Sequence, residues 1–143
     1  MVDVSDKPIT ARVATASGKV TMKPGTLLMI QNHEASKGDV LGVARIAAIH
    51  AVKLTPSLIP LCHAIPIDAV DVMFGFTDET TLTCDVSVRS TGRTGVEMEA
   101  MSGVAAACLT VYDMCKSVDR GMTIQSIRLL AKDGGKSGRF SAQ

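Results

Sequence analysis

Aromatic residues and net charge are both scarce in this sequence. Its 143 residues include no Trp, one Tyr and three Phe, which is 3% of the chain. Proteins that bind single-stranded nucleic acid by base stacking need aromatic platforms, and few are available here. The 15 Lys and Arg residues are balanced by 14 Asp and Glu residues, giving a net charge of +1. We therefore expect no general attraction to nucleic acid or anionic membranes, and any anion site must be local.

Cysteine motifs, targeting segments and long apolar runs are also missing. The four Cys residues form neither a C-x-x-C pair nor a zinc-like cluster, which argues against a disulfide scaffold or a structural metal. The first residues, MVDVSDKP, are too polar for a signal peptide. The longest uncharged apolar stretch, near residues 103–112, is much shorter than the roughly 20 residues that cross a membrane. These absences predict a cytoplasmic protein with reduced thiols and no membrane segment.

Hydrophobic residues, in contrast, are abundant. They make up 46% of the sequence, and the mean hydropathy is +0.26. Large exposed apolar patches are a liability in a monomer, so this surplus predicts a buried interface between subunits. The length fits one domain spanning residues 1–143, with no visible repeat, low-complexity segment or linker.

The spacing of apolar residues predicts an α+β chain. Alternation of apolar and polar residues predicts strands, and helical spacing predicts helices. The expected order is β–α–α–β–β–α–β, with strands at 11–22, 70–76, 82–89 and 123–131 and helices at 24–30, 40–54 and 96–120. This order is the ferredoxin-like split βαβ arrangement, in which helices cover one face of an antiparallel sheet.

Individual residues suggest where these elements begin, bend or end. Gly18 marks a bulge within the first strand, and Pro24 suits the first turn of a short helix. Asp39 is placed to cap the second helix, which Pro56 is expected to end. Gly121 is expected to cap the end of the long helix.

The long helix has two distinct faces at about 100° per residue. The face expected to lie on the sheet is apolar and contains Met101, Val104, Ala105, Cys108, Val111, Tyr112 and Cys115. The opposite face would normally be charged, but it carries mostly small groups: Ser102, Gly103, Ala106, Thr110, Met114 and Ser117. Because small residues let another helix approach closely, this face predicts a contact between subunits.

Charged residues on the long helix fall near its two ends. Asp113 and Lys116 are neighbours at i,i+3 spacing, which fits either a surface ion pair or part of a site. Glu97 and Glu99 lie near the start, where acidic residues also simply favour the positive end of the helix dipole. Glu99 and Asp113 share one side of the helix but are about 21 Å apart. Only a site assembled from two subunits would bring them together.

The loop containing Cys62 and His63 offers a thiol beside an imidazole. Adjacent residues seldom adopt a useful nucleophile–base geometry, so a Cys–His hydrolase is disfavoured and proton transfer by His63 alone is favoured. His33 and His50 lack the spacing that would complete a metal site, and His50 is interpreted as a packing residue.

The glycine-rich segment at 132–138 resembles a phosphate loop only superficially. Leu130 stands where a Walker A motif requires Gly, and no helix is expected after it. Two readings stay open: a cationic nest for phosphate around Lys132 and Lys136, or a solvated C-terminal segment. Lys37, in a Lys-Gly-Asp turn, is an equally weak signal. Together these polar groups suit acid–base chemistry on a phosphorylated small molecule.

Seven ordered strings along nearly the whole chain resemble one protein family. They are MVDVS at 1–5, KGDV at 37–40, ARIA at 44–47, LIPLCH at 58–63, TGVEMEA at 94–100, LTVYDMCK at 109–116 and RLLAK-GGKSG at 128–138. The sequence is identified on these strings as similar to the MoaC family, the cyclic pyranopterin monophosphate synthases of molybdenum-cofactor biosynthesis.

The resemblance implies a lyase with a ferredoxin-like fold. Its substrate would be (8S)-3′,8-cyclo-7,8-dihydroguanosine 5′-triphosphate, and its products cyclic pyranopterin monophosphate and pyrophosphate. The family assembles as a homo-hexamer, a trimer of dimers, with active sites between subunits. No nucleic acid or membrane partner is implied. The alternative is a non-catalytic ligand-sensing or assembly module, because a ferredoxin-like fold alone would also allow that.

The matching motifs imply roles for individual residues. Asp113 and His63 would transfer protons, with Glu99 holding the base or an intermediate. The phosphate-neutralising lysines would be Lys37, Lys116 and Lys132, with Lys136 and Arg12 as weaker candidates; substrate contacts would come from Leu61, Cys62, His63, Met98 and Glu99. No cofactor or metal is predicted, and although Mg²⁺ would be compatible with the phosphate step, the sequence shows no site for it.

Overall fold

The computed structural model describes residues 1–142. The elements follow the predicted order, with one additional short strand. They are β1 (Thr10–Thr21), α1 (Pro24–Gln31), α2 (Val40–Leu58), β2 (Ala69–Phe76), β3 (Thr81–Gly92), α3 (Glu97–Cys115), β4 (Thr123–Asp133) and β5 (Phe140–Ser141). The short strand β5 follows the glycine-rich segment 132–138, for which sequence reasoning left open a cationic nest or a solvated segment.

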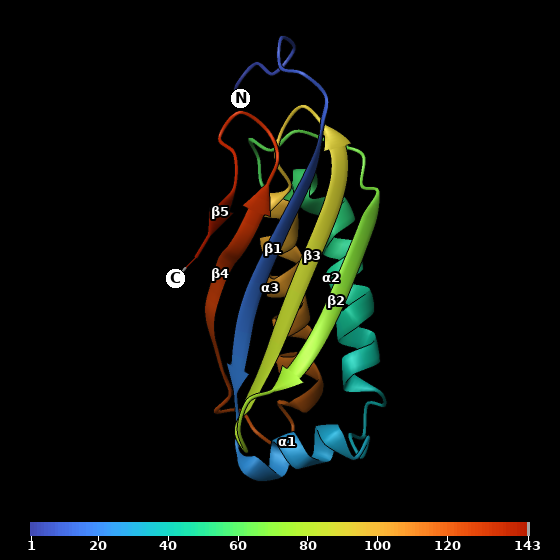
Figure 1. Ribbon diagram of the computed structural model, residues 1–143. Coiled ribbons are helices and arrows are strands. Elements are labelled where there is room, and N and C mark those ends of the chain that lie inside the picture. The colour runs from blue at the N-terminus through green and yellow to red at the C-terminus, as the bar shows by residue number, and fades with distance from the viewer. Residues whose placement is uncertain (143) are drawn as a thin grey trace.

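The strands form one antiparallel sheet in the order β2-β3-β1-β4-β5. Helices α2 and α3 lie side by side on one face of this sheet, and α1 lies across one end of the molecule (Figure 1). This arrangement confirms the predicted α+β, ferredoxin-like split βαβ fold. Segment 1–9, the β4–β5 connection and the start of α3 gather at the end opposite α1 (Figure 1).

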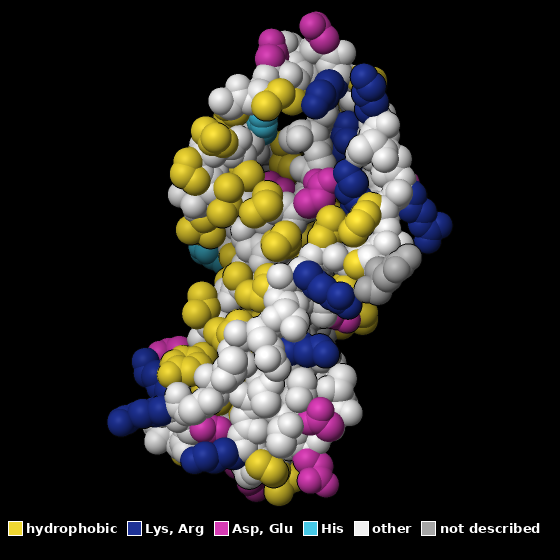
Figure 2. Space-filling model, turned by 90° about the vertical axis from the view of Figure 1, so that its left-hand side faces the viewer, with side chains coloured by type: hydrophobic (Ala, Val, Ile, Leu, Met, Phe, Trp, Pro, Cys, Tyr) yellow, Lys and Arg dark blue, Asp and Glu magenta, His cyan; other side chains and the backbone are white. Residues whose placement is uncertain are grey.

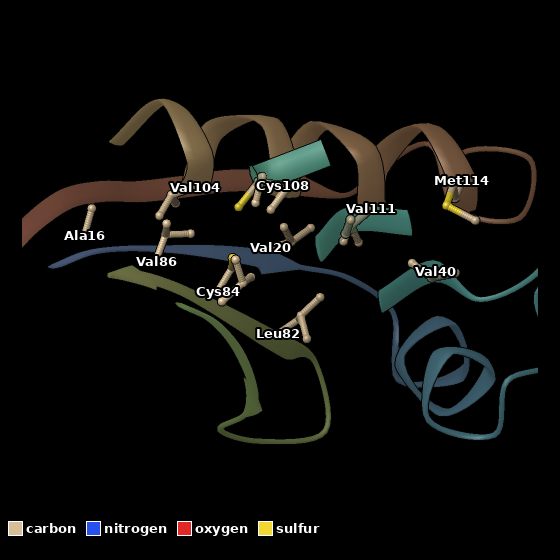
Figure 3. Packing of buried hydrophobic residues seen from close by; sticks show 14 of the residues in the cluster. Ala16, Val20, Val40, Leu82, Cys84, Val86, Val104, Cys108, Val111 and Met114 are labelled. Carbon is tan, nitrogen blue, oxygen red and sulfur yellow. The ribbon is translucent and has the colours of Figure 1, made fainter. Parts of the chain in front are cut away.

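The core lies between the sheet and the two long helices. Strand alternation turns Ala16 of β1 and its partner Val86 of β3 toward the helices, where both are fully buried. Val104 and Cys108 of α3 pack onto this layer (Figure 3). Gly18 allows the close approach, since a Cβ there would lie 2.5 Å from a methyl group of Val104.

The irregularity expected at Gly18 is present, with the extra residue on the neighbouring strand. Ser17 pairs with Arg128 and Lys19 pairs with Gln125, so β4 contributes one more residue than β1. Within this bulge Ser126 has φ of 57°, in the left-handed region.

The small-residue face of α3 packs in part against α2 of the same chain. Gly103 is buried, and a Cβ there would lie 2.9 Å from Val52 and 3.4 Å from the carbonyl oxygen of Ala48. Met114 is buried as well. The prediction that this whole face meets another subunit was therefore wrong, because α2 covers the buried part of it. Of the residues predicted to lie on the sheet, Met101, Ala105 and Tyr112 are only half-buried.

Two helix ends also differ from prediction. Helix α3 ends at Cys115 with Lys116 as its C-cap, and Gly121 does not cap it. The amides of Val118 and Asp119 both donate to the carbonyl of Cys115, which turns the chain toward α1. Helix α2 continues past Pro56 to Leu58, because a proline in the last turn removes only one intrahelical hydrogen bond. Across residues 1–142, no helix combines the length and apolarity needed to cross a bilayer.

Candidate functional site

The predicted site residues lie in two groups at opposite ends of α3. The helix runs from the end near segment 1–9 to the end near α1 (Figure 1). Glu97 and Glu99 are in its first turn, while Asp113 is in its last. The structure therefore separates within one chain the residues that the sequence assigned to a single site.

Two adjoining clefts occupy the end where α3 begins. We call the first the His63 cleft; its volume is about 490 Å³, and it is lined by Met1, Val2, Val4, Lys7, Leu61, Cys62, His63, Thr94 and Glu99. We call the second the basic cleft; its volume is about 380 Å³, and it is lined by Lys7, Arg12, Arg93, Thr94, Gly95, Glu97, Lys132, Lys136 and Ser137. Lys7 and Thr94 line both clefts, so the two lie next to each other.

This part of the surface is visibly hollowed. Figure 2 shows a cavity in the upper part of the molecule with acidic side chains inside it, Lys and Arg side chains along one side and hydrophobic side chains over the other. A ligand with an uncharged ring system and an anionic tail has the complementary pattern.

Glu99 is the buried carboxyl group of the His63 cleft. Its residue is only 3% exposed, although the first turn of a helix normally faces acidic residues toward solvent. Burial raises the pKa of Glu99, and the charge of nearby Glu97 raises it further. This carboxyl group therefore holds its proton more tightly than an exposed Glu does.

Cys62 is half-buried beside Glu99 in the same cleft. Partial burial raises the pKa of its thiol, and the Glu99 charge raises it as well. A thiol held in its neutral form is a poor nucleophile. The environment thus agrees with the sequence argument against a Cys–His hydrolase.

The basic cleft is built around an ion pair. Lys132 Nζ lies 3.0 Å from a carboxylate oxygen of Glu97 and donates to Ser137 Oγ at 2.7 Å. Arg12 donates to the carbonyl oxygens of Gly92 and Arg93 at 3.0 and 3.1 Å, which fixes its guanidinium at the cleft wall. Preorganised cations around an open cleft suit the binding of a polyphosphate.

Sequence reasoning missed three charged residues of these clefts. Glu97 was interpreted only as a helix-dipole residue, Arg93 received no role, and Lys7 was not considered. The contact of Glu97 with Lys132 joins residues far apart in the chain, so local spacing carried no signal for it. The basic residue in the Thr-Gly-Arg-Thr-Gly loop, Arg93, was the one visible hint.

The other end of α3 carries an exposed triad of Lys37, Asp113 and Lys116. Lys37 Nζ donates to the carboxylate of Asp113 at 2.9 Å and to its carbonyl oxygen at 3.0 Å. Lys116 Nζ donates to the other carboxylate oxygen at 2.6 Å. Hydrogen bonds from Lys116 and Lys37 lower the pKa of Asp113 to about 2. The turn that brings Lys37 here contains Gly38, whose φ is 96°.

A buried carboxylate supports this second end. Asp119 is 2% exposed and accepts hydrogen bonds from the Lys23 amide at 2.8 Å and the Thr26 hydroxyl at 3.2 Å. It also accepts from the amide of Gly121 at 3.1 Å. Asp119 thereby ties the turn after α3 to the start of α1, the helix that leads to Lys37.

The remaining histidines contribute to neither cleft. His33 and His50 are exposed, so the interpretation of His50 as a packing residue was wrong. In the part of the chain that the structure describes, no group of three or more His, Cys, Asp or Glu residues is placed to hold a metal ion.

Comparison with known proteins identifies the class to which this fold and these clefts belong. The sequence profile of the MoaC family matches residues 1–135, and the chain belongs to that family. It is 51% identical over 140 residues to a protein of Brevibacillus brevis named cyclic pyranopterin monophosphate synthase, covering 98% of this chain and 88% of that protein. A protein of the same name from Cereibacter sphaeroides strain ATCC 17029 is 54% identical over 145 residues, covering 99% of this chain and 90% of the relative. The family resemblance is confirmed, and an enzyme is supported over a ligand-sensing module.

Proposed function

We propose that the chain is a cyclic pyranopterin monophosphate synthase acting on the cyclised guanosine triphosphate derivative in the cytoplasm. Near full-length identity of 51–54% to enzymes of that name supports the reaction. The observation in the structure that carries the proposal is the adjacency of two clefts, one with proton-transfer groups and one with cations. The substrate has the matching two parts, a ring system and a triphosphate.

The ring chemistry is assigned to the His63 cleft. The guanine-derived imidazole ring opens and a pyrazine ring closes, so protons must move onto and off nitrogen and carbon atoms. His63 and Glu99 face one cleft, and Glu99 is buried with a raised pKa. A carboxyl group in this state donates a proton near neutral pH more readily than an exposed one. Leu61, Cys62 and Met98 are assigned as substrate contacts around these groups.

The phosphate chemistry is assigned to the basic cleft. A ribose-derived hydroxyl attacks the α-phosphorus, the bond to the β-phosphate oxygen breaks, and pyrophosphate leaves. Lys132 and Lys136, with Arg12 behind them, neutralise charge on the triphosphate in this arrangement. Positioning and electrostatics dominate phosphoryl transfer, so fixed cations are the main protein contribution that the step needs.

The Lys37–Asp113–Lys116 triad completes the site in a dimer. One stripe of α3 faces outward and is free of bulky charged groups between its ends; it contains Met98, Ser102, Ala105, Ala106, Leu109 and Asp113. Met98 and Leu109 are exposed, and the residues between them are half-buried. Two copies of α3 packed antiparallel about a point between Ala105 and Ala106 would place Met98 opposite Asp113 of the partner subunit. The two-fold rotation maps the stripe onto itself. The start of α3 in each subunit would therefore lie against the end of α3 in the other, which gives two equivalent contacts in each dimer.

In this dimer the triad faces the clefts of the partner subunit. Asp113 would then act on the ring system with His63, while Lys37 and Lys116 would hold the phosphates with Lys132. Such a dimer would be the building unit of the homo-hexamer that the family resemblance implies. The abundant hydrophobic residues, with exposed Ile46, Leu58 and Leu109 on the helical layer, provide surface for it.

Pyrophosphate release from the cyclised precursor tests the function. The protein alone should release one equivalent of pyrophosphate per precursor consumed, whereas a ligand-sensing module would bind the precursor and release none. A preparation that binds the precursor without releasing pyrophosphate contradicts the proposal.

Subunit complementation tests the shared site. His63→Ala and Asp113→Asn should each be inactive, but mixed and reassembled subunits should recover about a quarter of wild-type activity, since half the dimers are mixed and half their sites intact. An Ala106→Cys variant should form a disulfide-linked dimer, because small residues allow Cα atoms to approach within the range of about 4.4–6.8 Å. Glu79→Cys, exposed in the β2–β3 turn, is the control that should not cross-link. Failure of both experiments would refute the shared site.

A further inference from the structure

Segment 1–9, which precedes β1, contributes to the site rather than to the core. Four of the nine residues that line the His63 cleft come from it: Met1, Val2, Val4 and Lys7. Met1 is 75% exposed and Val2 is 72% exposed, so these apolar side chains are not packed into the interior. Apolar side chains at the rim of a cleft gain burial only when something occupies it.

The segment has a defined local shape that presents Lys7. The amide of Lys7 donates to the carbonyl of Val4 at 3.1 Å, closing a turn. Asp3 accepts from the amide of Ser5 at 2.9 Å and from its hydroxyl. Lys7 is the last residue of this turn and lines both the His63 cleft and the basic cleft.

Lys7 differs from two other cations of the basic cleft, Lys132 and Arg12, in the contacts of its charged group. Lys132 is paired with Glu97, and Arg12 is bound to two backbone carbonyls. Within residues 1–142, no carboxylate lies within 4.0 Å of Lys7 Nζ. Its ammonium group is therefore available to an anion without breaking an existing ion pair.

We propose that Lys7 is a further substrate-binding residue, which contacts the phosphate nearest the ring system and anchors segment 1–7 across the bound ligand. The inference rests on the proposed function, since it assigns the triphosphate to the basic cleft. The junction of the clefts is where the ring-bearing part of such a ligand meets its first phosphate. One charge-assisted hydrogen bond at that point stabilises the bound state and closes the segment over it.

Binding of inorganic tripolyphosphate tests this role without requiring turnover. Lys7→Ala should weaken tripolyphosphate binding about tenfold by calorimetry, and Lys7→Arg should remain within about threefold of wild type. With the cyclised precursor, Lys7→Ala should raise KM by a similar factor with a smaller change in kcat. Lys19→Ala, exposed on the outer sheet face, is the matched control and should behave as wild type. Because Lys7 is exposed, its removal should leave the thermal unfolding temperature unchanged.

Proteolysis tests the closing of the segment. Asp-N endoproteinase cleaves before Asp6, and saturating tripolyphosphate should slow this cleavage at least about fivefold in the wild type but not in Lys7→Ala. Wild-type binding and protection in Lys7→Ala would overturn the inference while wild-type pyrophosphate release still upheld the proposed function. Absence of pyrophosphate release by the wild type would instead refute the function itself.

Discussion

The two ends of α3 carry carboxylates in opposite physical states. Glu99 at the first turn is buried, and burial raises its pKa. Asp113 at the last turn is exposed between Lys37 and Lys116, and their hydrogen bonds lower its pKa to about 2. The carboxyl group at one end is thus harder to ionise than an ordinary Glu, and the one at the other end is easier to ionise than an ordinary Asp. A reaction that needs both a proton donor and a proton acceptor is served by two such environments.

The two ends also differ in how their cations are held. Near Glu99 the cations line a cleft whose walls are fixed by Arg12 and by the Lys132–Glu97 pair. Near Asp113 the two lysines share one exposed carboxylate. The difference teaches that the first end can enclose a ligand by itself, whereas the second is a projecting group that needs a surface to act upon.

The largest expected effect comes from removing the exposed carboxylate of Asp113. Asp113→Asn should lower kcat about 10²–10⁴-fold, because a positioned acid–base group contributes that much, while precursor binding changes little. Asp78→Asn, an exposed carboxylate in the β2–β3 turn, should retain wild-type kcat. A wild-type rate in Asp113→Asn would show that the exposed end takes no part in catalysis.

The next largest expected effect is a loss of stability when the buried Asp119, which supports the Asp113 end of α3, is replaced. Asp119→Ala should lower the free energy of unfolding by about 2–3 kcal/mol, because buried donors of Thr26 and the Lys23 amide lose their acceptor. Urea denaturation measures this loss, and Asp71→Ala, which removes an exposed pair with Arg89, should cost less than about 1 kcal/mol. Equal losses in the two variants would show that Asp119 does not anchor the turn.

A smaller effect is expected on KM when single cations of the basic cleft are removed, and its size should differ between Lys132 and Lys136. Lys132→Ala should raise KM about tenfold, since it removes a fixed cation and leaves the Glu97 charge uncompensated beside the phosphates. Lys136→Ala should raise KM only about threefold, because its exposed side chain must be ordered on binding. Both effects should shrink as salt is raised from 0.05 to about 0.5 M. Equal rises in KM for the two variants that do not change with salt would show that the phosphates bind outside the basic cleft.

The smallest expected effect is on the pH dependence of thermal stability, and it comes from the buried carboxyl group of Glu99. The pKa of Glu99 is raised in the folded protein, so folding binds a proton that the unfolded chain releases at lower pH. Stability is therefore lost as pH rises through the window above the ordinary Glu pKa of 4.5. Glu99→Gln should abolish that loss and raise Tm at pH 7 by a few degrees, while lowering kcat. An unchanged slope of Tm with pH between 4.5 and 7 would contradict the assignment of the buried state.

Asp113 should show the opposite sign in the same measurement. Its pKa is lowered to about 2, so the contribution of its two lysine contacts is present above the ordinary Asp pKa of 3.8 and is lost as pH falls through about 2. Asp113→Asn should remove this acid-side dependence and leave the slope above pH 4.5 intact. Titration of the carboxyl groups followed by NMR would assign the acidic pH dependence to Asp113 and the one above pH 4.5 to Glu99 directly.

The fold could be predicted because its signals are local. Alternation in residues 82–89 and helical spacing in residues 40–54 depend only on nearby residues, and the strand order follows from the β–α–α–β–β–α–β sequence of elements. The end of α3 could not be predicted in the same way. It is decided by Asp119, whose hydrogen bonds reach Lys23 and Thr26 on another element.

The grouping of the candidate site residues could not be predicted from the sequence. Lys37 contacts Asp113 across 76 positions, and no local spacing encodes that contact. Glu97 was missed for the same reason, because its partner Lys132 lies on β4. The small-residue face was read correctly as a place for close helix packing, but α2 of the same chain fills the part around Gly103.

The sequence by itself determined the elements, the apolar layer and the chemical types available, since hydrophobic spacing and side-chain chemistry are properties of the residues alone. Tertiary structure decided that Glu99 is buried, that Asp113 is clamped by two lysines and that two clefts meet at Lys7. Each of these depends on through-space distance and desolvation, which arise only when segments remote in the chain are packed together.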